Sequence, residues 1–148
     1  VRRGVPTVVL IRQPGAAVRS LALRRPAASV GSLIHQYLDF YTPLLPVREG
    51  VYLADFAQVT GDFGAVTRGI NQRFATDFVC FAHTAANVER VFAEIDRINA
   101  ALGGDEYQVS RPSRERETAH EYTFTPAENQ LLAKAEALYE KLRAASIY

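Results

Sequence analysis

The hydrophobic positions of this chain recur with two periods, one typical of strands and one typical of helices. An apolar, β-branched run beginning at Thr7 predicts a buried strand over about 7–12, and a second run predicts a strand over 51–55. Between them, apolar residues at helical spacing predict a helix over about 29–45, and Pro14 with Gly15 opens a shorter helix over about 16–23. Two strands joined through helices indicate a parallel crossover, and therefore a helix-rich α/β fold.

The second half of the chain is predicted to be helical, with a polar loop over about 105–121. Helices are expected over about 61–74, 85–102 and 126–145, and Thr125, Pro126 and Glu128 form a capping-box pattern at the start of the last one. The residues expected to face inward are Phe63, Val66, Ile70 and Phe74 in the first helix, Val88, Val91, Phe92, Ile95, Ile98 and Leu102 in the second, and Leu131, Ala135, Leu138 and Leu142 in the third. The 148 residues are sufficient for one domain, and we assign 1–148 to it.

Charge is unevenly distributed along the chain. The totals of 17 basic and 16 acidic residues give a net charge of +1, which argues against a general nucleic-acid binder. Six arginines nevertheless precede the first acidic residue, Asp39; they are Arg2, Arg3, Arg12, Arg19, Arg24 and Arg25. A local anion site fits this asymmetry, although Arg2, Arg3, Arg24 and Arg25 are equally consistent with a solvent-facing surface.

Arg12 has the most informative position, because it stands at the carboxyl end of the first predicted strand. Ligands of open α/β sheets collect at that edge, and the N–H groups at the start of the next helix favour an anion. A guanidinium adds paired N–H donors that match the oxygens of a phosphate. This arrangement predicts one half of a phosphate-binding site.

The spacing of Arg12, Pro14 and Ser20 resembles the Arg-x-Pro-x5-Ser element of sulfotransferases that use 3′-phosphoadenosine-5′-phosphosulfate (PAPS). The resemblance implies that Arg12 and Ser20 bind the 3′-phosphate of PAPS, and that the chain has part of a P-loop three-layer fold. It also implies sulfuryl transfer to a hydroxyl or amine of an acceptor, an unknown small molecule or saccharide.

The order of elements after Ser20 is also similar to that family over roughly residues 5–80. A long helix, a strand ending at Asp55 and a helix containing Ile70 and Phe74 follow in the family's order. Ala54 departs from the pattern, since the family usually has an acidic residue there.

The parts of the family that perform the chemistry have no counterpart in this chain. No lysine-bearing glycine loop and no match to the family's histidine base occur, so we assign no catalytic residue. The chain contains no methionine, even at position 1. We therefore expect the chain to be the C-terminal portion of a longer protein. This portion lacks the P-loop, and we expect it to be inactive alone. The spacings of His35, His83 and His120 match no compact metal site, and we expect no metal.

Other interpretations remain open. The same residues fit a fragment of a P-loop kinase-like nucleotide enzyme, and the amphipathic helices also fit a non-catalytic helical interaction domain that assembles with itself or with another protein. The basic segment 110–116 is interpreted as a solvated loop in preference to a second phosphate clamp, because acids are interleaved with its arginines. The chain has a single cysteine, Cys80, which we expect to be buried. It has no pattern of a membrane span or a signal peptide, and we therefore predict a cytoplasmic location.

Overall fold

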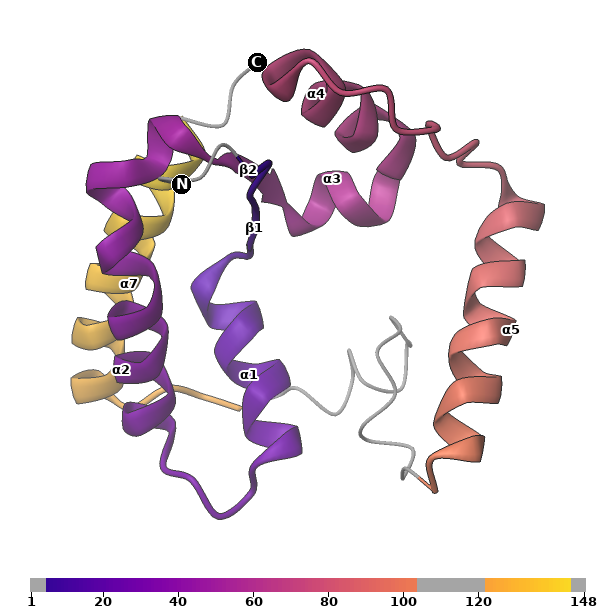
Figure 1. Cartoon of the computed structure of the whole chain (residues 1–148). Coiled ribbons are helices and arrows are strands. Elements are labelled where there is room, and N and C mark those ends of the chain that lie inside the picture. Colours follow the sequence, from indigo (N-terminus) through magenta and orange to yellow (C-terminus); the bar gives the residue numbers. More distant parts are fainter. Residues whose placement is uncertain (1–4, 104–121, 145–148) are drawn as a thin grey trace.

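The two predicted strands form a parallel pair in the computed structural model, which describes residues 5–103 and 122–144 (Figure 1). β1 (Val8–Ile11) pairs with β2 (Tyr52–Asp55), in a register that places Val8 beside Tyr52 and Ile11 beside Asp55. Helices make up most of the rest of the described chain. The fold is therefore a helix-rich α/β arrangement with a small parallel sheet, as the hydrophobic pattern predicts.

Three helical segments connect the strands. They are α1 (Pro14–Arg24), α2 (Val30–Tyr41) and the 3-10 helix η1 (Thr42–Gly50). Pro14 is the first residue of α1, and the Ser29 hydroxyl caps α2 by accepting a hydrogen bond from the Ser32 N–H. The sequence predicts one helix as far as Leu45, but the α-helix ends at Tyr41. Proline has no N–H to donate, and Pro43 and Pro46 therefore favour the change to a 3-10 helix.

In the described part of the chain after β2, one helix was not predicted from the sequence. This helix, α3 (Phe56–Gly61), follows β2 directly, and Asp62 separates it from α4 (Phe63–Phe74). α5 (Ala85–Ala101) and α7 (Pro126–Ala144) follow. The predicted capping box of α7 is confirmed, because the Thr125 N–H donates to the Glu128 carboxylate at 2.9 Å and the Glu128 N–H donates to the Thr125 hydroxyl at 3.3 Å.

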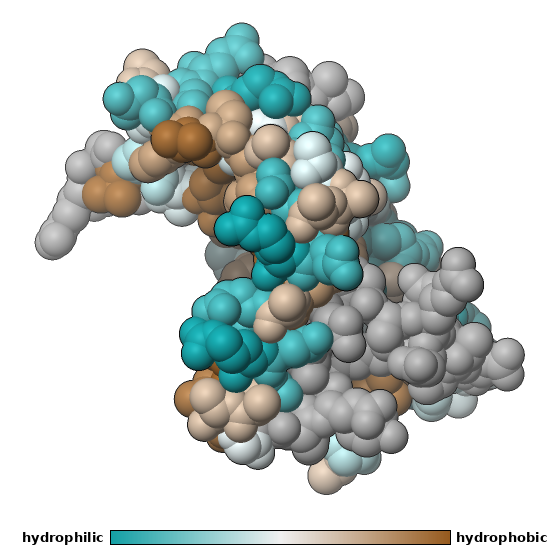
Figure 2. Space-filling model, turned by 90° about the vertical axis from the view of Figure 1, so that its right-hand side faces the viewer, coloured by the Kyte–Doolittle hydropathy of each residue, from teal (hydrophilic) through white to brown (hydrophobic). Residues whose placement is uncertain are grey.

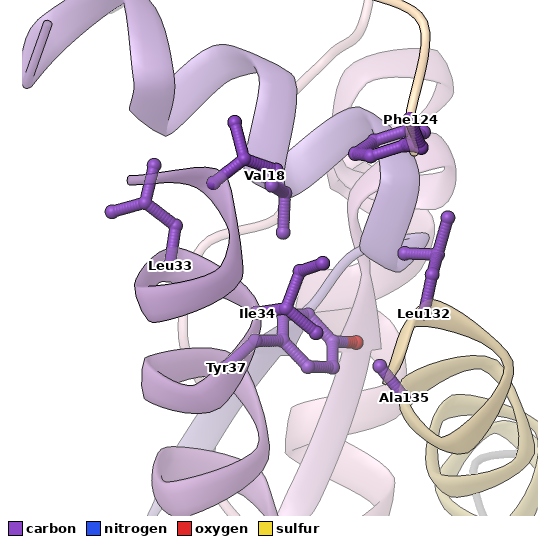
Figure 3. Close-up of a cluster of buried hydrophobic side chains, with 8 residues drawn as sticks. Val18, Leu33, Ile34, Tyr37, Phe124, Leu132 and Ala135 are labelled. Atoms are coloured by element: carbon purple, nitrogen blue, oxygen red, sulfur yellow. The ribbon is translucent and has the colours of Figure 1, made fainter. Parts of the chain in front are cut away.

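Among the residues that the structure describes, two hydrophobic clusters form the core, and α7 contributes to both. The first joins α1, α2 and the start of α7 (Figure 3); its buried members are Val18, Val30, Leu33, Ile34, Tyr37, Phe124, Leu132 and Ala135. The second joins the sheet to the end of α7, and its buried members are Ile11, Val51, Leu53, Leu138, Tyr139 and Leu142. Helix α7 lies beside α2 and completes both clusters, although it is the last element of the described chain (Figure 1).

The sheet has helices on both sides of β2. Leu53 packs toward α7, whereas Tyr52 reaches α4, where its ring lies against Gly69. Of the four residues expected inward on α4, Val66 is buried, but Phe63 is 43% exposed and the neighbouring Thr67 is buried instead. On α7, Leu132 is buried where Leu131 was expected, and Leu131 is partly buried.

Helix α5 forms as predicted, but its predicted inward face is not buried. None of its residues is buried; Val91 and Ile98 are 42% and 46% exposed, and Leu102, the C-cap, is 79% exposed. The helix shares no substantial contact with another described helix or strand and stands apart from α2 and α7 (Figure 1). The surface on that side is mixed, with hydrophobic residues in separate places among hydrophilic ones (Figure 2). The expectation was wrong because periodicity identifies an apolar face without identifying what covers it.

Two further observations concern Cys80 and the length and composition of the helices. Cys80 is exposed, contrary to the expectation of burial, because it lies in the irregular segment that follows α4. Within the described ranges, no helix combines the length and the apolar character needed to cross a membrane.

Candidate functional site

The carboxyl ends of β1 and β2 meet at one edge of the sheet, and Arg12 lies there. Ile11 pairs with Asp55, so the residues that follow them, Arg12 and Phe56, are neighbours. Because side chains alternate along a strand, Arg12 and Phe56 lie on the side opposite to the buried Ile11. The Cζ atom of Arg12 is 4.2 Å from the centroid of the Phe56 ring, which is a cation–π contact. The ring supports the guanidinium at the sheet edge and leaves its N–H groups available.

The charge of Arg12 is not neutralised within the described part of the chain. Arg12 is partly buried, and its guanidinium makes no hydrogen bond or ion pair with the residues described in 5–103 and 122–144. Burial lowers the pKa of Arg12 from its ordinary value, and the nearby positive charge of Arg24 lowers it further. Arginine nevertheless stays protonated at neutral pH, so a partly desolvated cation faces a second cation here.

The nearest strand-end carboxylate, that of Asp55, is engaged elsewhere. One oxygen of Asp55 accepts a hydrogen bond from the Ala57 N–H at 2.8 Å, which caps α3. The other oxygen accepts a hydrogen bond from the Tyr139 hydroxyl on α7. Tyr139 and Ile11 belong to the same buried cluster, so the carboxylate of Asp55 lies on the α7 side and Arg12 on the other. This opposition explains why the two charged neighbours form no ion pair.

The start of α1 is less open to an anion than the sequence analysis expected. The Oε1 atom of Gln13 accepts a hydrogen bond from the Ala16 N–H at 2.7 Å, and Pro14 has no N–H. The Nε2 atom of Gln13 also donates to Glu136 on α7 at 3.4 Å. The donors for an anion at this edge therefore come chiefly from the Arg12 side chain.

Ser20 lies on α1, with its hydroxyl free of any side-chain hydrogen bond to the described residues. It is the seventh residue of α1, about 9 Å along the helix axis from Pro14. No hydrogen bond joins Ser20 to Arg12 within the described ranges, so a ligand bound by both would have to bridge them. Arg24 lies four residues after Ser20 and shares its helix face. Arg24 was not predicted as a site residue, although its spacing of four residues from Ser20 on a helix was a signal for it.

Two tyrosines of α2 hold the backbone of β1 beside the site. The Tyr37 hydroxyl donates to the carbonyl oxygen of Arg12 at 2.8 Å, and the Tyr41 hydroxyl donates to that of Leu10, also at 2.8 Å. Burial, and then the proximity of Tyr41, Tyr139 and Asp55, raises the pKa of Tyr37 well above its ordinary value, so that hydroxyl remains a donor at neutral pH. The sequence pattern placed both tyrosines on an apolar stripe and carried no sign of these bonds.

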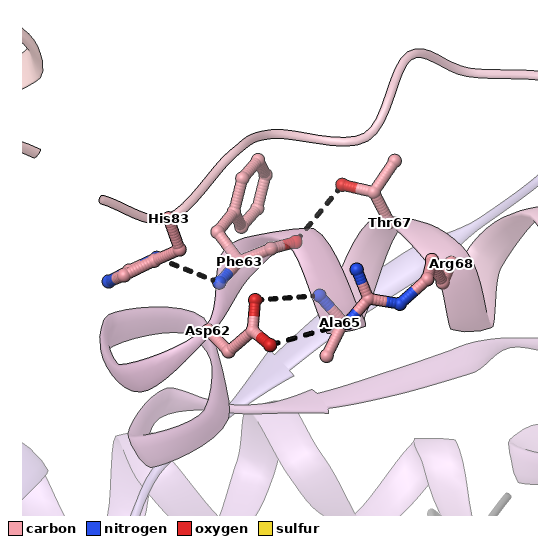
Figure 4. Close-up of polar contacts among 6 residues, drawn as sticks. All are labelled: Asp62, Phe63, Ala65, Thr67, Arg68 and His83. Carbon is pink, nitrogen blue, oxygen red and sulfur yellow. Dashed lines mark hydrogen bonds and ion pairs between the residues drawn. The ribbon is translucent and has the colours of Figure 1, made fainter. Parts of the chain in front are cut away.

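A second group of polar residues, around the start of α4, has a structural role (Figure 4). Asp62 accepts a hydrogen bond from the Ala65 N–H at 2.9 Å and pairs with Arg68 at 3.3 Å. The Ala65 bond is the main cause of a lowered pKa at Asp62, and Arg68 adds to it. The Nδ1 atom of His83 accepts a hydrogen bond from the Phe63 N–H at 3.0 Å and so fastens the segment after α4 to the start of that helix.

The described residues contain no group of three or more His, Cys, Asp or Glu side chains that could hold a metal ion. His35 is exposed, and its Nδ1 atom is 2.8 Å from the Gly31 carbonyl oxygen. His120 and the basic segment 110–116 lie outside the described residues. The interpretation of that segment as a solvated loop, in preference to a second phosphate clamp, therefore stays a prediction.

Comparison of the chain with protein-family models, with curated proteins and with solved structures gives no match.

Proposed function

We propose that this chain supplies the binding site for the 3′-phosphate of a nucleotide sulfate donor, in a sulfotransferase-like protein of the P-loop class. Arg12 and Ser20 are the residues proposed to bind that phosphate. The observation that supports the proposal most is the partly buried Arg12 guanidinium, which stacks on Phe56 and has no anionic partner in the described ranges. A desolvated cation is costly unless an opposite charge accompanies it, and a phosphate would provide that charge.

The residues fit the phosphate group of PAPS. Arg12 offers paired N–H donors to two phosphate oxygens, the Ser20 hydroxyl offers a further donor, and Arg24 adds positive charge from the same helix face as Ser20. The donor nucleotide would supply the sulfuryl group for transfer to a hydroxyl or amine of an acceptor. The contribution proposed for this chain is to bind and orient the nucleotide, which lowers the barrier to transfer by positioning.

Calorimetric titration with 3′-phosphoadenosine-5′-phosphate tests the proposal. Wild-type chain should bind, and Arg12→Ala should weaken binding about 10- to 100-fold, the range expected for a charged hydrogen-bonded contact. Arg90→Ala on α5 is the matched control, because it removes the same charge from an exposed position on a helix that makes no extensive contact with another described element. Adenosine 5′-phosphate, which lacks the 3′-phosphate, should bind less tightly than the bisphosphate and should lose little affinity in Arg12→Ala.

The same titration separates the alternatives. Tight ATP binding that depends on Arg12, without a preference for a 3′-phosphate, would favour a kinase-like nucleotide enzyme. Equal affinities of wild type and Arg12→Ala, or no binding by either, would refute the phosphate assignment. A non-catalytic interaction domain would then be the better interpretation. The exposed apolar residues Val91 and Ile98 of α5, and Leu102 directly after it, favour that second candidate.

A further inference from the structure

Two side chains of α2 form hydrogen bonds with the backbone along the outer edge of β1. In a parallel pair, the backbone groups of alternate residues point to opposite sides of the strand. The Tyr52 N–H donates to the Thr7 carbonyl at 2.8 Å, so the carbonyls of Leu10 and Arg12 point away from β2. The hydroxyls of Tyr41 and Tyr37 donate to these two carbonyls, each at 2.8 Å. The two tyrosines thereby satisfy acceptors that an edge strand would otherwise leave to water or to another chain.

The ring of Tyr37 is closely packed in the core. Its side chain is 7% exposed and belongs to the first core cluster, together with Val18, Ile34 and Ala135 (Figure 3). Its ring also lies 4.5 Å, between centroids, from that of Tyr41. A close-packed ring has few alternative positions, so the direction of its hydroxyl is fixed by the core.

The acceptor of this bond is the backbone of Arg12 itself. The Arg12 carbonyl precedes the Gln13–Pro14 turn, where the chain changes from β1 to α1. Fixing that carbonyl restricts the ψ angle of Arg12, and with it the direction in which the Arg12 side chain leaves the backbone. The contact with Phe56 restrains the other end of the same side chain, at 4.2 Å from the ring centroid. Arg12 is therefore restrained at both its backbone and its guanidinium.

We propose that Tyr37 is a positioning residue for the anion site, which uses its hydroxyl to hold the backbone of Arg12 so that the guanidinium is pre-oriented toward the phosphate. This inference rests on the proposed function of Arg12. Pre-orientation raises affinity because the ordering cost of the arginine side chain is met during folding, before the ligand arrives.

The chain contains a closely matched control for the test. Tyr41 lies on the same helix, four residues later, and makes the same hydroxyl-to-carbonyl bond to the same strand, but its acceptor belongs to Leu10. Tyr37→Phe and Tyr41→Phe each remove one oxygen atom and keep the ring. Tyr37 is buried and Tyr41 is partly buried, so a general loss of stability in either variant is measured separately by urea denaturation, whereas an effect on Arg12 should be confined to Tyr37→Phe.

Two measurements test the inference. Titration with 3′-phosphoadenosine-5′-phosphate should show about fivefold weaker binding by Tyr37→Phe, the change expected for one hydrogen bond, and a change within about twofold for Tyr41→Phe. In the ligand-free protein, the ¹⁵N heteronuclear NOE of Arg12 Nε–H should fall in Tyr37→Phe and stay unchanged in Tyr41→Phe. Circular dichroism spectra that match wild type establish that both variants are folded.

The outcomes separate this inference from the proposed function. If Arg12→Ala loses affinity while Tyr37→Phe and Tyr41→Phe bind alike, the phosphate site stands and the positioning role of Tyr37 is overturned. An unchanged Arg12 NOE in Tyr37→Phe also overturns it, without reference to any ligand. If the wild-type chain fails to bind the bisphosphate, the proposed function fails, and this inference fails with it.

Discussion

The hydroxyl of Tyr139 donates a hydrogen bond to the Oδ2 atom of Asp55, two residues that are 84 positions apart in the sequence. The bond joins α7 to the carboxyl end of β2, beside the candidate site. The other oxygen of Asp55 caps α3, so a single carboxylate connects a strand end, a helix start and the last helix. This use of Asp55 leaves Arg12 without an internal acidic partner in the described ranges.

Removing the Tyr139 hydroxyl should destabilise the fold. Tyr139→Phe keeps the buried ring but leaves one oxygen of Asp55 without its donor, and we expect the free energy of unfolding to fall by about 1–2 kcal/mol. Urea denaturation followed by circular dichroism measures this change. In Asp55→Asn, which keeps a side-chain acceptor for the cap of α3, the Tyr139→Phe substitution should cost clearly less. Equal costs in the two backgrounds would contradict the assigned bond.

Stability should fall steeply at alkaline pH. Burial, together with the hydrogen bond to Asp55 and its charge, raises the pKa of Tyr139 to about 12, from an unfolded value of about 10. A pKa raised on folding means that the folded state favours the neutral phenol. The corresponding stability is fully present below about pH 10 and is lost as the pH rises toward 12. Urea denaturation from about pH 8 upward should show this decline, and a smaller one in Tyr139→Phe. An identical pH profile for both proteins would exclude Tyr139 as a cause.

The apolar face of α5 should contribute little to folding of the isolated chain. Ile98→Ala should change the free energy of unfolding by no more than about 0.5 kcal/mol, because Ile98 is 46% exposed. The matched substitution Ile34→Ala on α2 should cost about 2–5 kcal/mol, because Ile34 is fully buried in the first core cluster. Thermal and urea denaturation compare the two variants. A cost at Ile98 comparable to that at Ile34 would show that α5 is packed in solution.

Two helical glycines should respond in opposite directions to alanine. A Cβ atom at Gly64 on α4 would collide with the carbonyl oxygen of Phe81, so Gly64→Ala should destabilise by about 1–3 kcal/mol. A Cβ at Gly31 on α2 has no neighbour within 4 Å, and Gly31→Ala should stabilise by about 0.5–1 kcal/mol through helix propensity. Melting temperatures of the two variants provide the measurement. Stabilisation by Gly64→Ala would mean that the segment containing Phe81 does not pack on α4.

Most of the fold followed from short-range patterns. Both strands, their parallel pairing and the capping box of α7 were predicted, because apolar runs, helical spacing and caps depend on residues close together in the sequence. The division of the predicted helix at Tyr41 and the helix α3 were missed. The caps that define α3 come from Asp55 and Gln58, whose pairing no periodicity reveals.

The candidate site was predicted only in part. The end of β1 and the position of Arg12 at the sheet edge were accessible from the sequence, and the structure agrees with both. The sequence did not reveal that Arg12 contacts Phe56, that Tyr37 bonds to the Arg12 carbonyl, or that Gln13 accepts a hydrogen bond from the Ala16 N–H. Whether Arg12 and Ser20 bind a phosphate remains the proposal that the titrations test.

Local chemistry thus defines where this chain forms strands and helices, since hydrogen bonding and side-chain entropy act over a few residues. The orientation of Arg12 and the burial of each helix face depend on contacts between distant segments. Asp55 bonds to Tyr139, 84 positions away, and the Arg12 guanidinium lies on the Phe56 ring. Helix α5 is about as amphipathic as α2, but none of its residues is buried. The amphipathic pattern is similar for a buried helix and an exposed one. It cannot distinguish them, because the free energy of burial is gained only when a complementary surface is present.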